Sequence, residues 1–266
     1  MPILSVDLAC RRWTDLGIVI LDRAPAQMVM HPRALPLPQV IDCRVIASSA
    51  DGLADGPVDP EILAGRLNHL CAVNNIRVLM LDGPQAWKSE ENGLSCARLS
   101  ERALNTVSKT GLPGMVKPST YRTFSEFCID VYDALARRGW RRLETRTQTI
   151  EPGQRILVES YPHAAWKSLG IVPLPSKRRS HVSDLARAYA ELQRIVPFTT
   201  NRPPNHDQLQ AIVGGLPGLA LEERNNAALR IVGAPPRREQ GHWREGFIVL
   251  PVPPPKPEAQ TLRWLN

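Results

Sequence analysis

Five acidic residues of this chain stand in short apolar runs or at the start of helix-like segments: Asp7, Asp82, Glu159, Asp184 and Asp207. A carboxylate inside a buried strand is costly unless a cation, a base or a proton neutralises it. Clustered carboxylates suit Mg²⁺ or Mn²⁺, because these hard cations prefer oxygen ligands. Two such ions could activate a water molecule and stabilise the leaving oxygen of a phosphodiester. The leading hypothesis is therefore a metal-dependent nuclease.

Each acid also has a structural interpretation that the sequence leaves open. Asp7 could cap the turn after the first strand, and Asp82-Gly83-Pro84 forms a good turn by itself. Asp207 could be an ordinary acid of a helix N-terminus, and Asp184 an exposed acid of another helix. Glu159 is hard to explain in this way, because it is embedded in a strand-like run.

Other side chains could assist the same chemistry. Lys177 could contact a scissile phosphate or could simply precede a helix on the surface. His163 and His206 follow or precede two of the acids and could transfer protons, or they could be structural. The aromatic residues that could stack on bases, or pack in the core instead, are Trp13, Trp87, Trp166 and Tyr161.

The apolar patterns predict an order of elements that would position these acids. We expect strands over 3–9, 17–22, 40–47, 76–81 and 155–161, helices over 60–75, 125–138, 180–196 and 205–223, and a late hairpin over 228–232 and 246–250. Three strands before the first helix indicate an α/β fold of the RNase H-like kind, a mixed five-stranded sheet with helices on both faces. In such a sheet strands one and four are adjacent and parallel, so Asp7 and Asp82 would approach each other, and a late helix would add a third acid.

Length and composition predict how this fold is extended. The 266 residues suit one large domain, which we place at 1–252, with a helical insertion at about 85–150 and a C-terminal hairpin. Pro32–Pro38 reads as a loop, and 253–266 as a Pro-rich tail that follows an extended segment from Pro251. There is no G-x-G-x-x-G and no Walker A pattern, so the two common phosphate loops are absent from the sequence.

The net charge and the cysteines indicate which partners and which cellular compartment to expect. The net charge of +7 and three arginine-rich or lysine-rich clusters permit DNA or RNA as a partner without establishing it. The clusters are Arg137-Arg138 with Arg141-Arg142, Lys177-Arg178-Arg179, and Arg237-Arg238. Five scattered cysteines argue against disulfides or a zinc site, and no leader or membrane span is evident. We therefore expect a cytoplasmic protein with no membrane partner and an unknown oligomeric state.

Several short motifs resemble, in order and spacing, those of the domain-of-unknown-function family 429. They are Val6-Asp7-Leu8-Ala9, Leu81-Asp82-Gly83-Pro84, Val158-Glu159-Ser160-Tyr161-Pro162-His163, Pro175-Ser176-Lys177-Arg178, Asn205-His206-Asp207-Gln208-Leu209-Gln210-Ala211 and Glu245-Gly246-Phe247-Ile248. The members of that family are described as predicted nucleases with an RNase H fold.

The resemblance implies catalytic roles for five residues: Asp7, Asp82, Glu159, Asp207 and Lys177. The four acids would be the ligands of Mg²⁺ or Mn²⁺. The chain departs from the family at Gly83, where an alanine is common, and in the late helix, where the stretch equivalent to a second Asp-Ala repeat reads Gln208-Leu209-Gln210-Ala211. The second change favours an alternative function, a binding module for nucleic acid or protein that keeps the fold without catalysis. A nucleotide-phosphate enzyme is a third hypothesis, which the absent phosphate loops disfavour.

Overall fold

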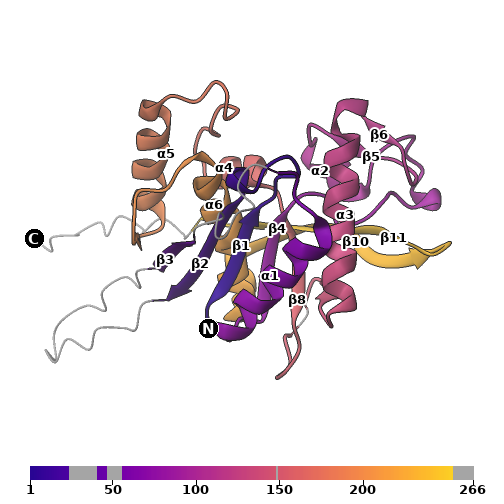
Figure 1. Ribbon diagram of the computed structural model, residues 1–266, viewed down its shortest axis with the longest axis horizontal. Helices are drawn as coiled ribbons and strands as arrows, with labels where there is room; N and C mark the ends of the chain where they lie inside the picture. The colour runs from indigo at the N-terminus through magenta and orange to yellow at the C-terminus, as the bar shows by residue number, and fades with distance from the viewer. Residues whose placement is uncertain (24–40, 47–55, 148, 254–266) are drawn as a thin grey trace, which may run out of the picture.

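A wide mixed sheet is the centre of the molecule (Figure 1). The computed structural model describes residues 1–23, 41–46, 56–147 and 149–253. The predicted loop at Pro32–Pro38 and nearly all of the predicted tail lie outside these residues. Among the described residues, no helix has the length and apolar character needed to cross a membrane.

The elements follow the predicted order with several additions. The strands are β1 Ile3–Asp7, β2 Gly17–Arg23, β3 Ile41–Ile46, β4 Val78–Asp82, β5 Lys109–Thr110, β6 Val116–Lys117, β7 Arg141–Arg142, β8 Ile156–Ser160, β9 Phe198–Thr200, β10 Leu229–Glu239 and β11 His242–Pro251. The α-helices are α1 Pro60–Val73, α2 Leu99–Leu104, α3 Arg122–Arg137, α4 Pro162–Ser168, α5 Val182–Ile195 and α6 His206–Glu222. The 3₁₀ turns are η1 Trp13–Asp15, η2 Glu90–Asn92, η3 Ser119–Tyr121 and η4 Asn226–Ala228.

The central strands have the RNase H-like arrangement that the sequence predicts. They lie in the order β3-β2-β1-β4-β8; β2 is antiparallel to both β1 and β3, and β1, β4 and β8 are parallel to one another. The sheet is wider than the five strands expected. In the described part it has nine, because β9 pairs with β3 while β7 and the β10–β11 hairpin continue past β8. These additions satisfy strand edges that would otherwise expose unpaired backbone groups.

The start of α1 shows how local sequence sets an element boundary. Asp59 caps the helix, since its carboxylate accepts a hydrogen bond from the backbone N–H of Ile62 at 2.9 Å, and Pro60 follows at the first helical position. This confirms the helix start that the sequence predicts. Pro251, expected in an extended proline segment, instead ends strand β11.

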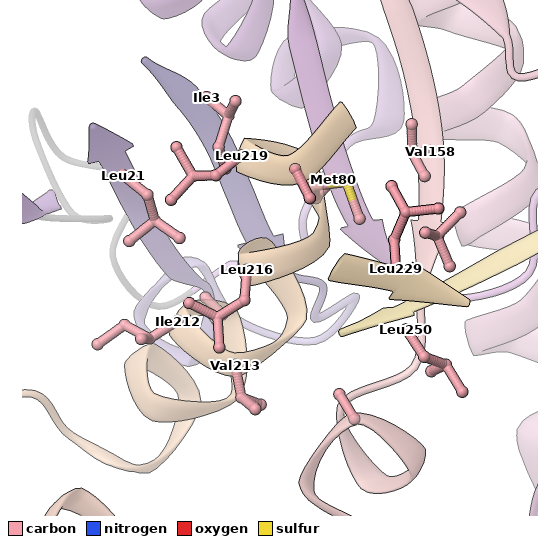
Figure 2. Packing of buried hydrophobic residues seen from close by; sticks show 14 of the residues in the cluster. Ile3, Leu21, Met80, Val158, Ile212, Val213, Leu216, Leu219, Leu229 and Leu250 are labelled. Carbon is pink, nitrogen blue, oxygen red and sulfur yellow. The ribbon is translucent and has the colours of Figure 1, made fainter. Parts of the chain in front are cut away.

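The two faces of the sheet carry two separate cores, because side chains alternate along each strand. Ile3, Met80 and Val158 face α6, where they pack with residues such as Leu216 and Leu219 (Figure 2). The intervening residues face α1 and α3. They include Leu4, Val6, Leu79, Leu81 and Leu157. This alternation decides on which face each acid at the end of a strand must lie.

Candidate functional site

Asp7 and Asp82 meet at the carboxyl ends of two neighbouring parallel strands. They are directly paired in the register of β1 and β4, and both continue the alternation that faces α6. Because the two carboxyl groups are adjacent and buried, ionising both at once is unfavourable. Burial and the Asp82 charge raise the pKa of Asp7 well above its usual value, and burial raises that of Asp82 to about 7.

Helix α6 brings the third acid to the same place. Gly17 is the cross-strand partner of Asp7, and a Cβ at Gly17 would lie 2.1 Å from the backbone oxygen of Asp207. Only glycine allows the first turn of α6 to approach β2 so closely. Asp207 is buried there with 4% of its surface exposed, and its charge further raises the pKa of Asp7.

Lys177 is the basic residue of this cluster. Its ammonium group forms an ion pair with Asp207 and a second one with Asp15 at 2.8 Å. Burial opposes the charge of Lys177, but the two carboxylates outweigh this effect and raise its pKa. Because 48% of the lysine side chain is exposed, the ammonium group stands at the solvent boundary of an otherwise shielded cluster.

His206 ties the loop that carries Lys177 to the start of α6. Its Nε2 lies 2.9 Å from the carbonyl oxygen of Pro175, and its Nδ1 lies 3.0 Å from a carboxylate oxygen of Asp207. Both ring nitrogens are therefore engaged in positioning. His163, the other histidine singled out from the sequence, lines a pocket beside Tyr161, and burial with the nearby Lys167 lowers its pKa.

Glu159 does not join the other acids, which corrects the expected set of four metal ligands. It is paired in register with Leu81, and Ser160 is the residue opposite Asp82. Glu159 therefore points to the face of α1 and α3, whereas Asp7 and Asp82 point to α6. One position along the strand is enough to move a side chain to the opposite face.

A buried arginine that the sequence did not single out neutralises Glu159. The guanidinium of Arg98 donates two hydrogen bonds to the Glu159 carboxylate, at 2.6 and 2.7 Å, and further bonds to Glu101 and Thr110. Burial raises the pKa of Glu159, and Arg98 acts against this rise. Both oxygens of Glu159 are thus occupied by a bidentate ion pair of the kind that arginine forms well. No motif or residue spacing in the sequence predicts this contact.

Gly83 explains one departure from the family that the motifs resemble. Its φ is 138°, and a Cβ at this position would lie 2.4 Å from the Sγ atom of Cys128. An alanine does not fit this backbone without rearrangement. The glycine thus holds the turn that follows Asp82 against α3.

Two pockets lie near the carboxyl ends of β1 and β4. One of about 240 Å³ is lined by Asp82, Glu159 and His163, and one of about 480 Å³ is lined by Arg11 and Asp15. Residues Tyr121 and Phe124, from η3 and α3, border both. Asp82 therefore lines one concave surface, and the second adjoins it at Tyr121 and Phe124.

Other residues considered from the sequence have structural roles. Asp184 accepts a hydrogen bond from the backbone N–H of His181 at 2.9 Å and so caps α5. Trp13, Trp87 and Trp166 are buried and face no open surface on which a base could stack. Tyr161 is half-buried and lines the smaller pocket.

The described residues contain no cluster in which three or more acidic, histidine or cysteine side chains already converge around one point in the manner of a metal site. The closest approach to such a site is the Asp7–Asp82 pair with Asp207 beside it. Mg²⁺ is commonly held by only one or two carboxylates, with water and substrate phosphates completing its shell. The oxygen donors of this pair fit such an ion, since a cation would replace the proton that burial favours.

Comparison with known proteins gives limited information. No family model matches the chain, and no curated protein matches it. Among solved structures, RuvC of Thermus thermophilus matches with 8% identity, 80% of this chain and 90% of that chain covered, and a TM-score of 0.35. The complex of T. thermophilus RuvC with a Holliday junction substrate matches with 10% identity, the same coverage and the same TM-score. Likeness at this level carries no argument about activity.

Proposed function

We propose that the protein is a divalent-metal-dependent nuclease that hydrolyses phosphodiester bonds of DNA or RNA. The observation that carries this proposal is the in-register pair of Asp7 and Asp82, two buried carboxyl groups with raised pKa values at the carboxyl edge of an RNase H-like sheet. Membership in the domain-of-unknown-function family 429 is part of the same proposal and rests on the motif order described above.

Asp7 and Asp82 would hold Mg²⁺ or Mn²⁺, with Asp207 as an outer or third ligand. When bound, such an ion polarises a phosphoryl oxygen and lowers the pKa of a coordinated water. The raised pKa values of the pair mean that a cation competes with a proton for the same oxygens. Metal affinity should therefore increase as pH rises through about 7. Glu159 is not included among the proposed ligands because Arg98 occupies it.

Lys177 would provide the contact to substrate phosphate. Its ammonium group has three N–H donors, and Asp207 and Asp15 take two of them. A third N–H on a half-exposed amine suits a phosphate oxygen arriving from solvent. In this arrangement Asp207 orients Lys177, and His206 holds the loop on which Lys177 stands.

Exposed basic residues on both sides of the acids support a polyanionic substrate. Arg11 and Arg12 follow β1, and Arg178 and Arg179 follow Lys177, all with exposed side chains. Such residues attract phosphates without reading base sequence. They therefore favour nucleic acid over an uncharged substrate and leave the choice between DNA and RNA to experiment.

A cleavage assay tests the proposal. Labelled single-stranded and double-stranded DNA and RNA would be incubated with the protein and with Mg²⁺, Mn²⁺ or no metal. We expect metal-dependent cleavage by the wild type and a loss of at least about 100-fold in Asp7→Asn and in Asp82→Asn. Asp130→Asn, which removes an exposed acid of α3, is the control and should cleave normally.

The non-catalytic binding module remains the second candidate, favoured by one observation. Asp207 is engaged by Lys177 and His206, so only two carboxylates are free to share a cation. Oligonucleotide binding that weakens steeply with salt, without cleavage under any metal, would replace the nuclease proposal by this one. Cleavage that persists in Asp7→Asn would reject the assigned site.

A further inference from the structure

Two arginine clusters that lie about a hundred residues apart in the sequence converge on one pocket away from the acids. The pocket has a volume of about 410 Å³ and lies between the end of α3, strand β7 and the β10–β11 hairpin. Four arginines and two tryptophans contribute to its lining: Arg137, Arg141, Arg142, Arg238, Trp140 and Trp243. Asp133 and Glu144 line it as well and pair with Arg142 and Arg141, and Arg137 pairs with Glu61, so the uncompensated positive charge of the described lining is that of Arg238.

Arg142 is the buried base of this pocket. Only 1% of its side chain is exposed, and it donates hydrogen bonds to Asp133 at 2.6 Å and to the carbonyl oxygen of Gln85 at 3.1 Å. Within the described part of the chain, its Nη1 and the Nε1 of Trp243 have no hydrogen-bond partner. Two unsatisfied N–H donors in adjacent side chains are costly unless an acceptor is supplied.

Arg238 brings a second positive charge to the same ring. Its guanidinium lies 5.2 Å from the centroid of Trp243, and that of Arg142 lies 4.5 Å from it. Arg238 is exposed, and across the described ranges it has no ion pair with an acid. Two like charges on one indole repel each other, and an anion placed between them would relieve this repulsion.

We propose that this pocket binds an oxyanion of the phosphate class, held by Arg238 at the rim and by the charge of Arg142 below. Arginine suits this ligand because its planar fork matches the geometry of phosphate oxygens. The phosphate could be a free inorganic or nucleotide phosphate or a phosphodiester of a nucleic acid.

The site is separate from the acid pair. Phe124 borders the pockets near the acids, and Ala136 borders this one. At a rise of 1.5 Å per residue, these two residues lie about 18 Å apart along α3. The proposal therefore does not depend on nuclease activity. If the chain does cleave nucleic acid, this pocket would hold a phosphate at a distance from the cleaved bond.

Calorimetric titration with inorganic phosphate and with a labelled oligonucleotide tests the site in the full chain. We expect Arg238→Gln to weaken binding of at least one of these probes by about tenfold or more. Arg230→Gln is the matched control, because Arg230 is an exposed arginine on the same strand β10 outside the pocket. Trp243 fluorescence gives a local readout, since a change on phosphate addition should vanish in Trp243→Phe.

The outcomes separate the two sources of phosphate. Saturable inorganic phosphate binding that falls in Arg238→Gln identifies a free phosphate or nucleotide. A loss of oligonucleotide affinity in Arg238→Gln, without saturable inorganic phosphate binding, identifies a nucleic-acid backbone. Equal behaviour of Arg238→Gln and Arg230→Gln, or no binding of either probe, overturns the proposal. Asp7→Asn should leave binding at this pocket unchanged, so the failure of the metal site and the failure of this site are distinguishable.

Discussion

At the scale of single residues, the role of each acid depends on the face of the sheet to which its side chain points. Asp7 and Asp82 lie on the α6 face, while Glu159 lies on the other face and is bound by Arg98. A carboxylate in a bidentate ion pair is not free to bind a metal. Glu159 thus stabilises the fold together with Arg98, whereas under the proposed function Asp7 and Asp82 would hold the metal.

The substitution Glu159→Gln tests this assignment. It leaves Arg98 buried with a weaker partner, so we expect the free energy of unfolding to fall by about 3 kcal/mol. Denaturant unfolding would measure this loss, and calorimetry would measure metal affinity under conditions where the variant is folded. Unchanged Mn²⁺ affinity supports a structural role. A large loss of affinity in a folded variant would return Glu159 to the set of ligands.

The acid pair also predicts how the stability of the metal-free protein depends on pH. Burial raises the pKa of Asp82 from 3.8 to about 7, so the folded state binds this proton more tightly than the unfolded state. The resulting stabilisation is complete below about 3.8 and is lost as pH rises through about 7. Between pH 5 and 8 we expect ionisation of the pair to lower the free energy of unfolding by on the order of 2 kcal/mol.

Thermal unfolding of the wild type and Asp82→Asn over this pH range measures the effect. The wild type should lose stability relative to the variant as pH rises, and added Mn²⁺ should reverse the loss by binding the deprotonated pair. Parallel pH profiles for the two proteins would show that folding does not raise the pKa of Asp82.

At the scale of elements, the close packing of α6 against the sheet positions the residues of the site. A Cβ at Gly17 would lie 2.1 Å from the backbone of Asp207, and backbone cannot move aside as a flexible side chain can. We expect Gly17→Ala to displace the first turn of α6 and to destabilise the protein by about 2–4 kcal/mol. Gly56→Ala is the control, since no atom of the described residues lies within 4 Å of its added Cβ. Equal stability of the two variants would mean that α6 can shift without cost.

Much of the arrangement of helices and strands could be predicted from the sequence. The apolar runs gave the five central strands, and Asp59-Pro60 marked the start of α1. The short strands β7 and β9 were not predicted, because two or three residues carry no periodic signal and pair only when tertiary contacts supply a partner.

The position of Glu159 escaped prediction for a related reason. Residues 156–158 are all apolar, so alternation could not show which face each side chain takes. The register that pairs Asp82 with Ser160 decides this, and register is a tertiary property. Arg98 was missed as well, because its partner lies 61 residues away in the sequence.

At the scale of the whole molecule, the net charge of +7 should govern how nucleic acid is attracted. We expect oligonucleotide affinity to fall steeply as salt rises from about 50 to 200 mM, because neutralised phosphates release counterions. Fluorescence anisotropy over a salt series would measure the slope of log affinity against log salt concentration. Lys177→Ala should reduce the magnitude of this slope by about one. An affinity that is independent of salt would argue against contacts to the phosphate backbone.

The central claim is that Asp7 and Asp82 form a cation site. The most direct measurement is calorimetric titration of Mn²⁺ into metal-free wild type, Asp7→Asn and the Asp130→Asn control at pH 8, with and without an oligonucleotide. We predict saturable binding in the wild type and the control, and a loss of at least about tenfold in Asp7→Asn. Unchanged binding in Asp7→Asn, or no binding by the wild type even with the oligonucleotide present, would contradict the account.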